Sequence, residues 1–371
     1  MPIIYCKTCL LPNTKPGLNF YKGICAACIN NSIKKKIDWG YRKKKLKKII
    51  DKIKKDNPSS MYDCVVPISN GGKDSWFQAS FMKNEMKCKV LCINLSAHLP
   101  TMEGISNINS MINSLNIDII KLTLKPSVHS SLRLKCFKRY GEPNWAEHLM
   151  VFAGVYNAAK LFNIPLIVWG EDISFEFGGS GKRQTPDASN LLFKNDLLKK
   201  KKLEDLLDEQ DISEKDLFFY KLPSISEIKA SRIKSIYLGY YINWDGEKNY
   251  NFVKKFGFKK ELRPRSGHLV GYDNIDEKLC EVNGWLKFLK FGFGYATDEL
   301  CYEIYNKRLS RRDAIKKLKK LNNDFHPDFL DDFLRFHKIS ENDFYDIALK
   351  FLNKNIFEPK GNWWSLKNYP K

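Results

Sequence analysis

The chain has 371 residues and a formal net charge of +21 at pH 7. It is long enough for two or three domains or one large α/β domain, and it has no apolar run of the roughly 18 residues that a membrane helix needs. Its first residues lack the pattern of a secretion signal, so the ten cysteines predict metal ligands and reduced thiols rather than disulfides. We therefore expect a cytoplasmic protein without membrane insertion, and the charge favours an anionic partner.

A cysteine motif opens the chain. Cys6 and Cys9 form one Cys-x-x-Cys pair, and Cys25 and Cys28 form a second pair after fifteen intervening residues. Two such pairs at this spacing bring four thiolates to one tetrahedral site. We predict a structural zinc ion held by all four cysteines, with two separate redox pairs as the alternative.

A lysine-rich helix is predicted after this motif. Segment 34–55 has apolar residues at helical spacing between runs of lysine. Its charged face is either a solvated surface or a binding surface for phosphate groups or membranes. The cysteine motif and this helix form the first predicted domain, residues 1–56, because Pro58 stops the helix.

Strands and helices then alternate. The predicted elements are strands at 64–68, 89–95, 118–124 and 165–170, and helices at about 74–86, 101–115 and 145–162. Short apolar strands separated by helices predict an α/β fold with a doubly wound parallel sheet. We assign residues 57–215 to this domain, with a loop and a helical insertion over 173–215. Residues 216–371 are predicted to form an aromatic-rich, mainly helical C-terminal region.

The turn after the first of these strands carries two adjacent glycines. It reads Ser-Asn-Gly-Gly-Lys-Asp-Ser over residues 69–75. Gly71 and Gly72 allow backbone N–H groups to point inward, and the next helix adds its free amides and the positive end of its dipole. These groups predict a site for an anion such as phosphate. Ser75 can donate to a phosphate oxygen, and Asp74 can hold Mg2+ or simply cap the helix of an ordinary turn.

This turn resembles the S-G-G-x-D-S loop of the PP-loop ATP-pyrophosphatases, the adenine nucleotide alpha hydrolase superfamily. Asn70 either replaces a serine of that loop or is inserted after Ser69, so either residue is the pyrophosphate contact. Within the superfamily the chain resembles the N-acetyl sugar amidotransferases of the WbpG/PseA type. Besides the cysteine motif and the turn, the similar blocks are PNWAEHLMVF (143–152), PLIVWGED (165–172), YLGYYINWDGEKN (237–249), LKFLKFGFGYATDE (286–299) and ISENDFYDIALKF (339–351).

The resemblance implies a reaction, its cofactors and its binding residues. Members of the family are taken to convert an acetamido group on a sugar into an acetamidino group, for surface glycans such as lipopolysaccharide or flagellin sugars, pseudaminic acid among them. ATP adenylates the amide oxygen and ammonia displaces AMP, so ATP, Mg2+ and structural Zn2+ are the implied cofactors. Asn94 lies at the carboxyl end of the second predicted strand, where nucleotide contacts are expected. The implied pyrophosphate loop is Ser69, Asn70, Gly71, Gly72, Lys73, Asp74 and Ser75.

The candidate catalytic residues are Lys73, Asp74 and Glu171. Glu171 follows a predicted strand, at the edge where ligands bind in such sheets, and it either contacts substrate or Mg2+ or has a structural capping role. His98, Asp298 and Glu299 have no assigned role. His98 is either catalytic or a satisfied core or surface histidine, and Asp298 either faces the sugar or caps a helix together with Thr297.

The partners follow from the same resemblance. The sequence contains no evident glutaminase site, so we expect separate glutaminase and cyclase-like subunits to supply ammonia to an acetamido sugar or its nucleotide-activated form. The alternatives are a PP-loop tRNA-modifying enzyme and a non-catalytic zinc-containing nucleic-acid-binding protein, because the charge suits RNA. Cys88 and Cys92 lie in or beside a predicted strand, a poor place for a sulfur relay, and no RNA-reading module is recognisable. We therefore expect no nucleic-acid partner.

Overall fold

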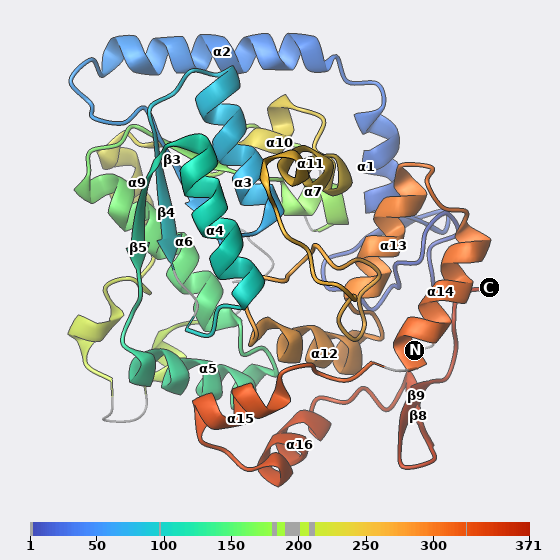
Figure 1. Cartoon of the computed structure of the whole chain (residues 1–371). Coiled ribbons are helices and arrows are strands. Elements are labelled where there is room, and N and C mark those ends of the chain that lie inside the picture. The colour runs from blue at the N-terminus through green and yellow to red at the C-terminus, as the bar shows by residue number, and fades with distance from the viewer. Residues whose placement is uncertain (1–2, 96–97, 180–183, 190–200, 208–211, 324) are drawn as a thin grey trace.

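A computed structural model describes residues 3–95, 98–179, 184–189, 201–207, 212–323 and 325–371 (Figure 1). The strands are β1 (Phe20–Tyr21), β2 (Ile24–Cys25), β3 (Cys64–Ile68), β4 (Val90–Leu95), β5 (Asp118–Leu122), β6 (Leu166–Trp169), β7 (Lys234–Tyr237), β8 (Phe357–Lys360) and β9 (Trp363–Leu366). The helices of the N-terminal half are α1 (Ala26–Lys34), α2 (Trp39–Asp56), α3 (Lys73–Ser80), α4 (Met102–Leu115), α5 (Pro126–Tyr140), α6 (Trp145–Leu161) and α7 (Ile173–Phe177). The later helices are α9 (Ile225–Ser231), α10 (Leu238–Tyr241), α11 (Gly246–Val253), α12 (Cys280–Phe291), α13 (Tyr295–Tyr305), α14 (Arg311–Asn323), α15 (Leu330–His337) and α16 (Glu341–Leu349).

A parallel sheet of five strands, in the order β5-β4-β3-β6-β7, is the centre of the fold. β3 has β4 on one side and β6 on the other, and every pairing in this sheet is parallel. The chain therefore winds outward from β3 in both directions, which makes the carboxyl ends of β3 and β6 the switch point of the sheet. The predicted α/β fold with a doubly wound parallel sheet is confirmed.

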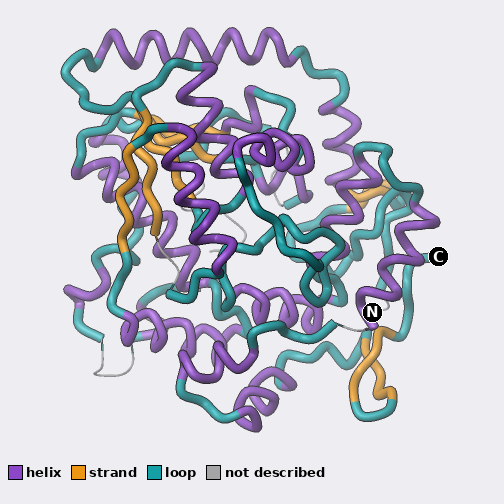
Figure 2. The backbone as a smooth tube through the Cα atoms, viewed as in Figure 1, coloured by secondary structure: helices purple, strands orange, loops and turns teal. Residues whose placement is uncertain are grey.

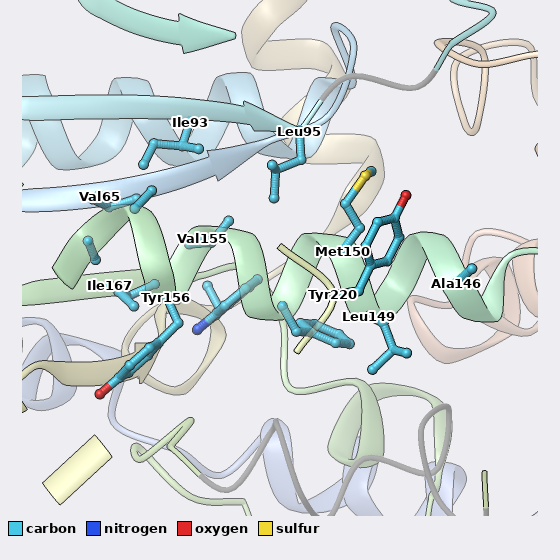
Figure 3. Close-up of a cluster of buried hydrophobic side chains, with 14 of the residues drawn as sticks. Val65, Ile93, Leu95, Ala146, Leu149, Met150, Val155, Tyr156, Ile167 and Tyr220 are labelled. Carbon is cyan, nitrogen blue, oxygen red and sulfur yellow. The ribbon is translucent and has the colours of Figure 1, made fainter. Parts of the chain in front are cut away.

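Different helices cover the two faces of the sheet, because side chains alternate along each strand. Val65 of β3 packs into a core with α5 and α6 on one face, and Val66 packs with α2, α3, α4 and α11 on the other. Figure 3 shows the first face, where Val65, Ile93 and Ile167 from three strands lie along α6 near Val155. The strands read as continuous apolar runs because both faces are buried.

Local signals fix the helix starts at the carboxyl edge of the sheet. Thr101 accepts a hydrogen bond from the amide of Gly104 (3.0 Å) and starts α4. Asp172 accepts from the amides of the first turn of α7. α3 differs, because among the described residues no side chain caps its N-terminus at Gly72. Its first amides therefore face the turn without a capping side chain.

The C-terminal helices form two apolar clusters beside the sheet, and the four-cysteine module packs into one of them. α12, α15 and α16 share one apolar cluster. Leu10 and Leu11 of the module share another cluster with Leu300 of α13 and Leu318 of α14. Figure 1 shows the module beside α13 and α14, with both chain ends nearby. The predicted cysteine module and helical C-terminal region are confirmed.

Several elements differ from the sequence prediction. The sequence does not predict α5, β7 or the hairpin β8–β9, and the predicted helix at 74–86 is α3 followed by a π-helical turn, Phe81–Glu85. β7 joins the sheet although it lies beyond residue 215, and the predicted domain boundaries stay predictions. The predicted insertion falls partly on residues 190–200 and 208–211, outside the described residues.

Within the described part of the chain, no helix is both long enough and apolar enough to span a bilayer.

Candidate active site at the switch point of the sheet

The glycine turn between β3 and α3 is compact and closely packed. The amide of Gly72 donates to Ser69 Oγ (3.0 Å), and Ser75 Oγ donates to the carbonyl oxygen of Gly72 (3.0 Å). Gly71 has φ of 110°, a conformation that favours glycine. A Cβ atom on Gly71 would collide with the carbonyl oxygen of Gly104 in α4. The two serines hold the turn, and α4 leaves room only for glycine.

Lys73 lies at the start of α3 between two carboxylates. Its side chain is almost fully buried, and Nζ forms ion pairs with Asp74 Oδ2 (2.6 Å) and with Asp273. Burial alone would lower the pKa of Lys73, but the charges of Asp273 and Asp74 outweigh it and hold that pKa above its usual value. Asn249 of α11 donates to Asp74 Oδ1 (2.7 Å) and fixes this carboxylate from the other side. A positive charge is thus fixed at the glycine turn.

A cavity of about 280 Å³ opens directly in front of Lys73 and Asp74. It lies beyond the carboxyl ends of β3 and β6, where ligands bind in such sheets. Its aromatic lining is Phe177, Trp244, Tyr272, Tyr295 and Tyr302. Its charged lining is Lys73, Asp74, Glu171, Glu247, Asp273, Lys287, Asp298, Glu299, Glu303 and Arg308. Aromatic faces beside hydrogen-bonding groups suit a sugar or a base, and the lysine and arginine side chains suit phosphate.

Glu171 reaches this cavity from the end of β6. Burial, and then the negative charge of Asp74, raise the pKa of Glu171 to about 7. A carboxyl group with such a pKa exchanges protons near neutral pH, which is the property of a general acid or base. The structure therefore places the three predicted catalytic residues, Lys73, Asp74 and Glu171, in the lining of one cavity.

Another part of the cavity wall comes from α12 and α13. Lys287 Nζ lies 2.5 Å from Asp298 Oδ2, and Lys15 Nζ of the cysteine module lies 3.4 Å from Asp298 Oδ1. Burial alone would raise the pKa of Asp298, but the two lysines lower it. Among the described residues no side chain caps α13, whose first residue is Tyr295, so the helix-cap alternative for Asp298 is wrong. Asp298 is instead an ionised group of the cavity wall.

Glu299 is the end of a buried chain of charges. It accepts from the amides of Leu269 (2.6 Å) and Val270 (3.2 Å) and contacts His268 Nδ1 (2.7 Å). His268 Nε2 lies 3.2 Å from Glu281 on its other side. Burial would lower the pKa of His268, but the hydrogen bonds to Glu281 and Glu299 raise it to about 10. The imidazolium fixes Glu299 and the loop before Tyr272.

The loop between α11 and α12 supplies cavity residues that the sequence prediction missed. It crosses the centre of the view in Figure 2 and carries Tyr272 and Asp273. Arg265 holds it by donating to the carbonyl oxygens of Asn274 (2.9 Å) and Ile275 (3.0 Å) and pairing with Glu281 (2.7 Å). The only sequence signal here was a Gly-Tyr-Asp-Asn turn, and turn residues of this kind recur in binding loops.

Other predicted contacts lie behind the turn rather than in the cavity. Asn94 is fully buried, and its Nδ2 donates to the carbonyl oxygen of Ile68 (3.2 Å) and to Asn70 Oδ1 (3.3 Å). Asn94 therefore ties β4 to the turn and does not line the cavity. His98 lies elsewhere, with its ring stacked on His129 at a centroid distance of 4.7 Å. Its core alternative agrees with this position.

The four cysteines meet at one point. Their sulfur atoms all lie within 4.8 Å of one another, with 3.7 Å between Cys6 and Cys28 and 3.5 Å between Cys9 and Cys25. Sulfur ligands about 2.3 Å from a tetrahedral zinc ion lie about 3.8 Å apart, so these distances fit zinc. Backbone amides also donate to Cys6 and Cys9, which stabilises thiolates. The residues fit a closed metal site without an open position for substrate.

The fold and the cavity define an α/β protein with a candidate active site at the switch point of its sheet. Residues 235–369 match the family model described as "LPS biosynthesis protein WbpG-like, C-terminal domain", which confirms the predicted resemblance over this part of the chain. The solved structure of NMN synthetase from Francisella tularensis is similar with a TM-score of 0.38 and 10% identity, covering 82% of this chain and 98% of that chain. No curated protein matches the chain.

Proposed function

We propose that this protein is an ATP-dependent amidotransferase that converts an acetamido group on a sugar into an acetamidino group. One observation carries the proposal. A protonated Lys73 at the uncapped start of α3 faces a cavity in which the pKa of Glu171 is about 7. The pair supplies charge stabilisation for a leaving phosphate and a base for a proton near neutral pH. The WbpG-like C-terminal domain supports a sugar substrate in lipopolysaccharide synthesis.

The chemistry has two steps. In the first, the amide oxygen attacks the α-phosphorus of ATP, the bond to the β-phosphate breaks, pyrophosphate leaves, and the amide nitrogen loses its proton. In the second, ammonia adds to the resulting imidate carbon and loses a proton, and AMP leaves with the former amide oxygen. The first step needs positive charge at pyrophosphate, and the second needs a proton acceptor near the carbon.

The residues of the turn and the cavity take separate roles in these steps. The amides of the glycine turn, the start of α3 and the ammonium group of Lys73 bind the pyrophosphate as its charge develops. Glu171 accepts the proton that ammonia loses. Mg2+, which neutralises phosphate charge when bound, would be held by Asp74, whose carboxylate already faces a cation at 2.6 Å.

The aromatic side chains of the cavity give the sugar its binding surface. Trp244, Tyr272 and Tyr295 belong to the aromatic lining of the cavity. Sugar rings pack their C–H faces on aromatic rings, and their hydroxyl groups donate to carboxylates such as Glu299. The zinc site is structural in this proposal. Ammonia comes from separate glutaminase and cyclase-like subunits, and the acceptor is an acetamido sugar or its nucleotide-activated form.

The test is AMP release from ATP by the purified protein with ammonium and a panel of acetamido sugars and their nucleotide forms. We expect one sugar to stimulate AMP formation and to show, by mass spectrometry, the decrease expected when an NH group replaces an oxygen atom. The variant Asp74→Ala abolishes the product. AMP formation that responds only to tRNA would instead support the tRNA-modifying alternative. No nucleotide cleavage with any acceptor would favour the non-catalytic alternative.

A further inference from the structure

The four-cysteine module ends in a buried lysine that reaches the candidate active site. Cys28 lies in α1, and Lys34 is the last residue of the same helix. Lys34 Nζ donates to both carboxylate oxygens of Glu176 (2.7 and 2.8 Å) and to the carbonyl oxygen of Trp244 (2.6 Å). All three N–H bonds of the ammonium group are therefore used. The lysine and the glutamate are both almost completely buried, at 7% and 6% exposed.

Both residues that Lys34 holds lead directly into the cavity. Trp244 lines the cavity itself. Glu176 accepts from the hydroxyl of Tyr302 (3.3 Å), another lining residue, and is followed by Phe177, whose ring lies 5.3 Å from that of Tyr302. One lysine of the cysteine module therefore holds the backbone of one aromatic lining residue, and through Glu176 it is linked to two more.

The contact between α1 and α7 is close along its whole length. Asn30 of α1 donates to the carbonyl oxygen of Phe175 (3.0 Å). A Cβ atom on Gly178, just after α7, would lie 2.6 Å from the side chain of Leu18 and 2.8 Å from the amide of Ala27. α7 starts directly after Glu171 and Asp172. A displacement of α1 therefore moves the segment that carries Glu171.

We propose that Lys34 is a positioning residue of the candidate site, which couples the metal-binding state of the four-cysteine module to Trp244, Tyr302 and the segment after Glu171. The inference rests on the proposed function only for its kinetic consequences. The metal fixes the start of α1, and Lys34 at the other end of the helix transmits that position to the cavity wall. Lys34 is buried, whereas the lysines that follow it in the chain are exposed to solvent. The link is therefore specific to Lys34.

The test uses the full chain labelled with fluorotryptophan, with the Trp244 signal assigned from a Trp244→Phe variant. Three variants are compared in the metal-loaded protein: Lys34→Met together with Glu176→Gln, which leaves no unpaired buried charge; Lys34→Arg; and the exposed neighbour Lys35→Met as control. We expect the double variant alone to shift the Trp244 fluorine signal, while the signal of Trp285 in the C-terminal core stays in place. Metal removal by a chelator shifts Trp244 in the wild type and no further in the double variant.

Kinetics separates positioning from simple stability. In the metal-loaded double variant we expect KM for the acceptor to rise roughly 10-fold with kcat nearly kept, and Lys34→Arg to restore most of the loss. An unchanged Trp244 signal with full metal content, or a KM equal to that of Lys35→Met, would overturn the inference. A shifted Trp244 signal in a protein that is inactive with every sugar would refute the proposed function and leave this coupling intact.

Discussion

Two buried polar clusters lie beyond the carboxyl edge of the sheet, and they differ in what surrounds them. In the cavity, Lys73 is paired with two carboxylates and faces open space. The second cluster, here called the histidine cluster, contains His98, His129, His337 and Arg133. Burial, and then the charge of Arg133, lower the pKa of His129 well below its usual value and that of His337 to about 3.

The histidine cluster lacks the features of a reaction centre. Its Arg133 pairs with Glu147 (2.5 Å), while His129 Nε2 and both carboxylate oxygens of Glu277 have no partner within the described part of the chain. Unpartnered buried atoms of this kind usually bind ordered water. Both clusters have shifted pKa values, but the cavity at the glycine turn is lined by residues of the first cluster and by none of the histidine cluster. A shifted pKa therefore identifies a candidate site only together with space for a ligand.

Lys73→Met gives the largest expected effect, because it removes the positive charge at the glycine turn. We expect AMP formation to fall by about 10²–10³-fold, as when a donor to a developing negative charge is removed. Initial rates at saturating ATP measure the change, and thermal unfolding checks that the variant is folded. The exposed Lys48→Met on α2 is the matched control. A rate near that of the wild type would move phosphate binding away from this turn.

Glu171→Gln tests the proton acceptor. We expect a loss of about 10²-fold, and in the wild type a rate that rises with pH and levels off above about 7. The rise should disappear in the variant. Because the folded-state pKa of Glu171 lies above the usual value of 4.5 for a glutamate, its contribution to stability is lost as pH rises from 4.5 to about 7, opposite to the rate. The exposed Glu358→Gln should change neither profile, and an unaltered profile in Glu171→Gln would exclude it as the base.

Gly71→Ala separates a steric collision from backbone strain. The added Cβ meets the carbonyl oxygen of Gly104, so we expect a loss of about 1–3 kcal/mol in the free energy of unfolding, measured with denaturant. Gly257→Ala is the control, because Gly257 also has a positive φ (94°) but nothing lies within 4 Å of its Cβ position. Equal losses in the two variants would mean that α4 does not restrict the turn.

His98→Phe is expected to have the smallest effect on activity. His98 belongs to the histidine cluster, where its Nε2 contacts the carbonyl oxygen of Leu124 (2.8 Å). We expect an unchanged rate of AMP formation with a modest decrease in stability from the lost hydrogen bond. A large fall in rate with a native melting profile would show that the histidine cluster takes part in the reaction.

The parts of the molecule that the sequence predicts are those set by local spacing. The cysteine pairs, four strands of the sheet and the turn from Ser69 to Ser75 each follow from residues close together in the chain. α5 escaped prediction because it buries His129 and Arg133, which breaks the apolar pattern of a helix. β7 has only four residues and becomes a strand through its pairing with β6.

Only part of the candidate site was predictable, because only some of its residues lie in local sequence patterns. Lys73 and Asp74 follow a predicted strand and its glycine turn, Glu171 directly follows another predicted strand, and the structure places all three at one cavity. Asp273, by contrast, pairs with Lys73 across a long stretch of sequence, and its loop is held by the carbonyl contacts of Arg265. No local pattern records such a contact. The contribution of this loop to the cavity is therefore a property of tertiary packing.

The most direct test of the proposed function follows the amide oxygen. An acetamido sugar labelled with the heavy oxygen isotope in its carbonyl group is incubated with ATP, ammonium and the protein, and the AMP is analysed by mass spectrometry. If the amide oxygen is adenylated in the cavity beside Lys73, the heavy atom appears in AMP and the sugar becomes an amidine. AMP without the heavy atom, or ADP and phosphate as the products, would contradict the proposal.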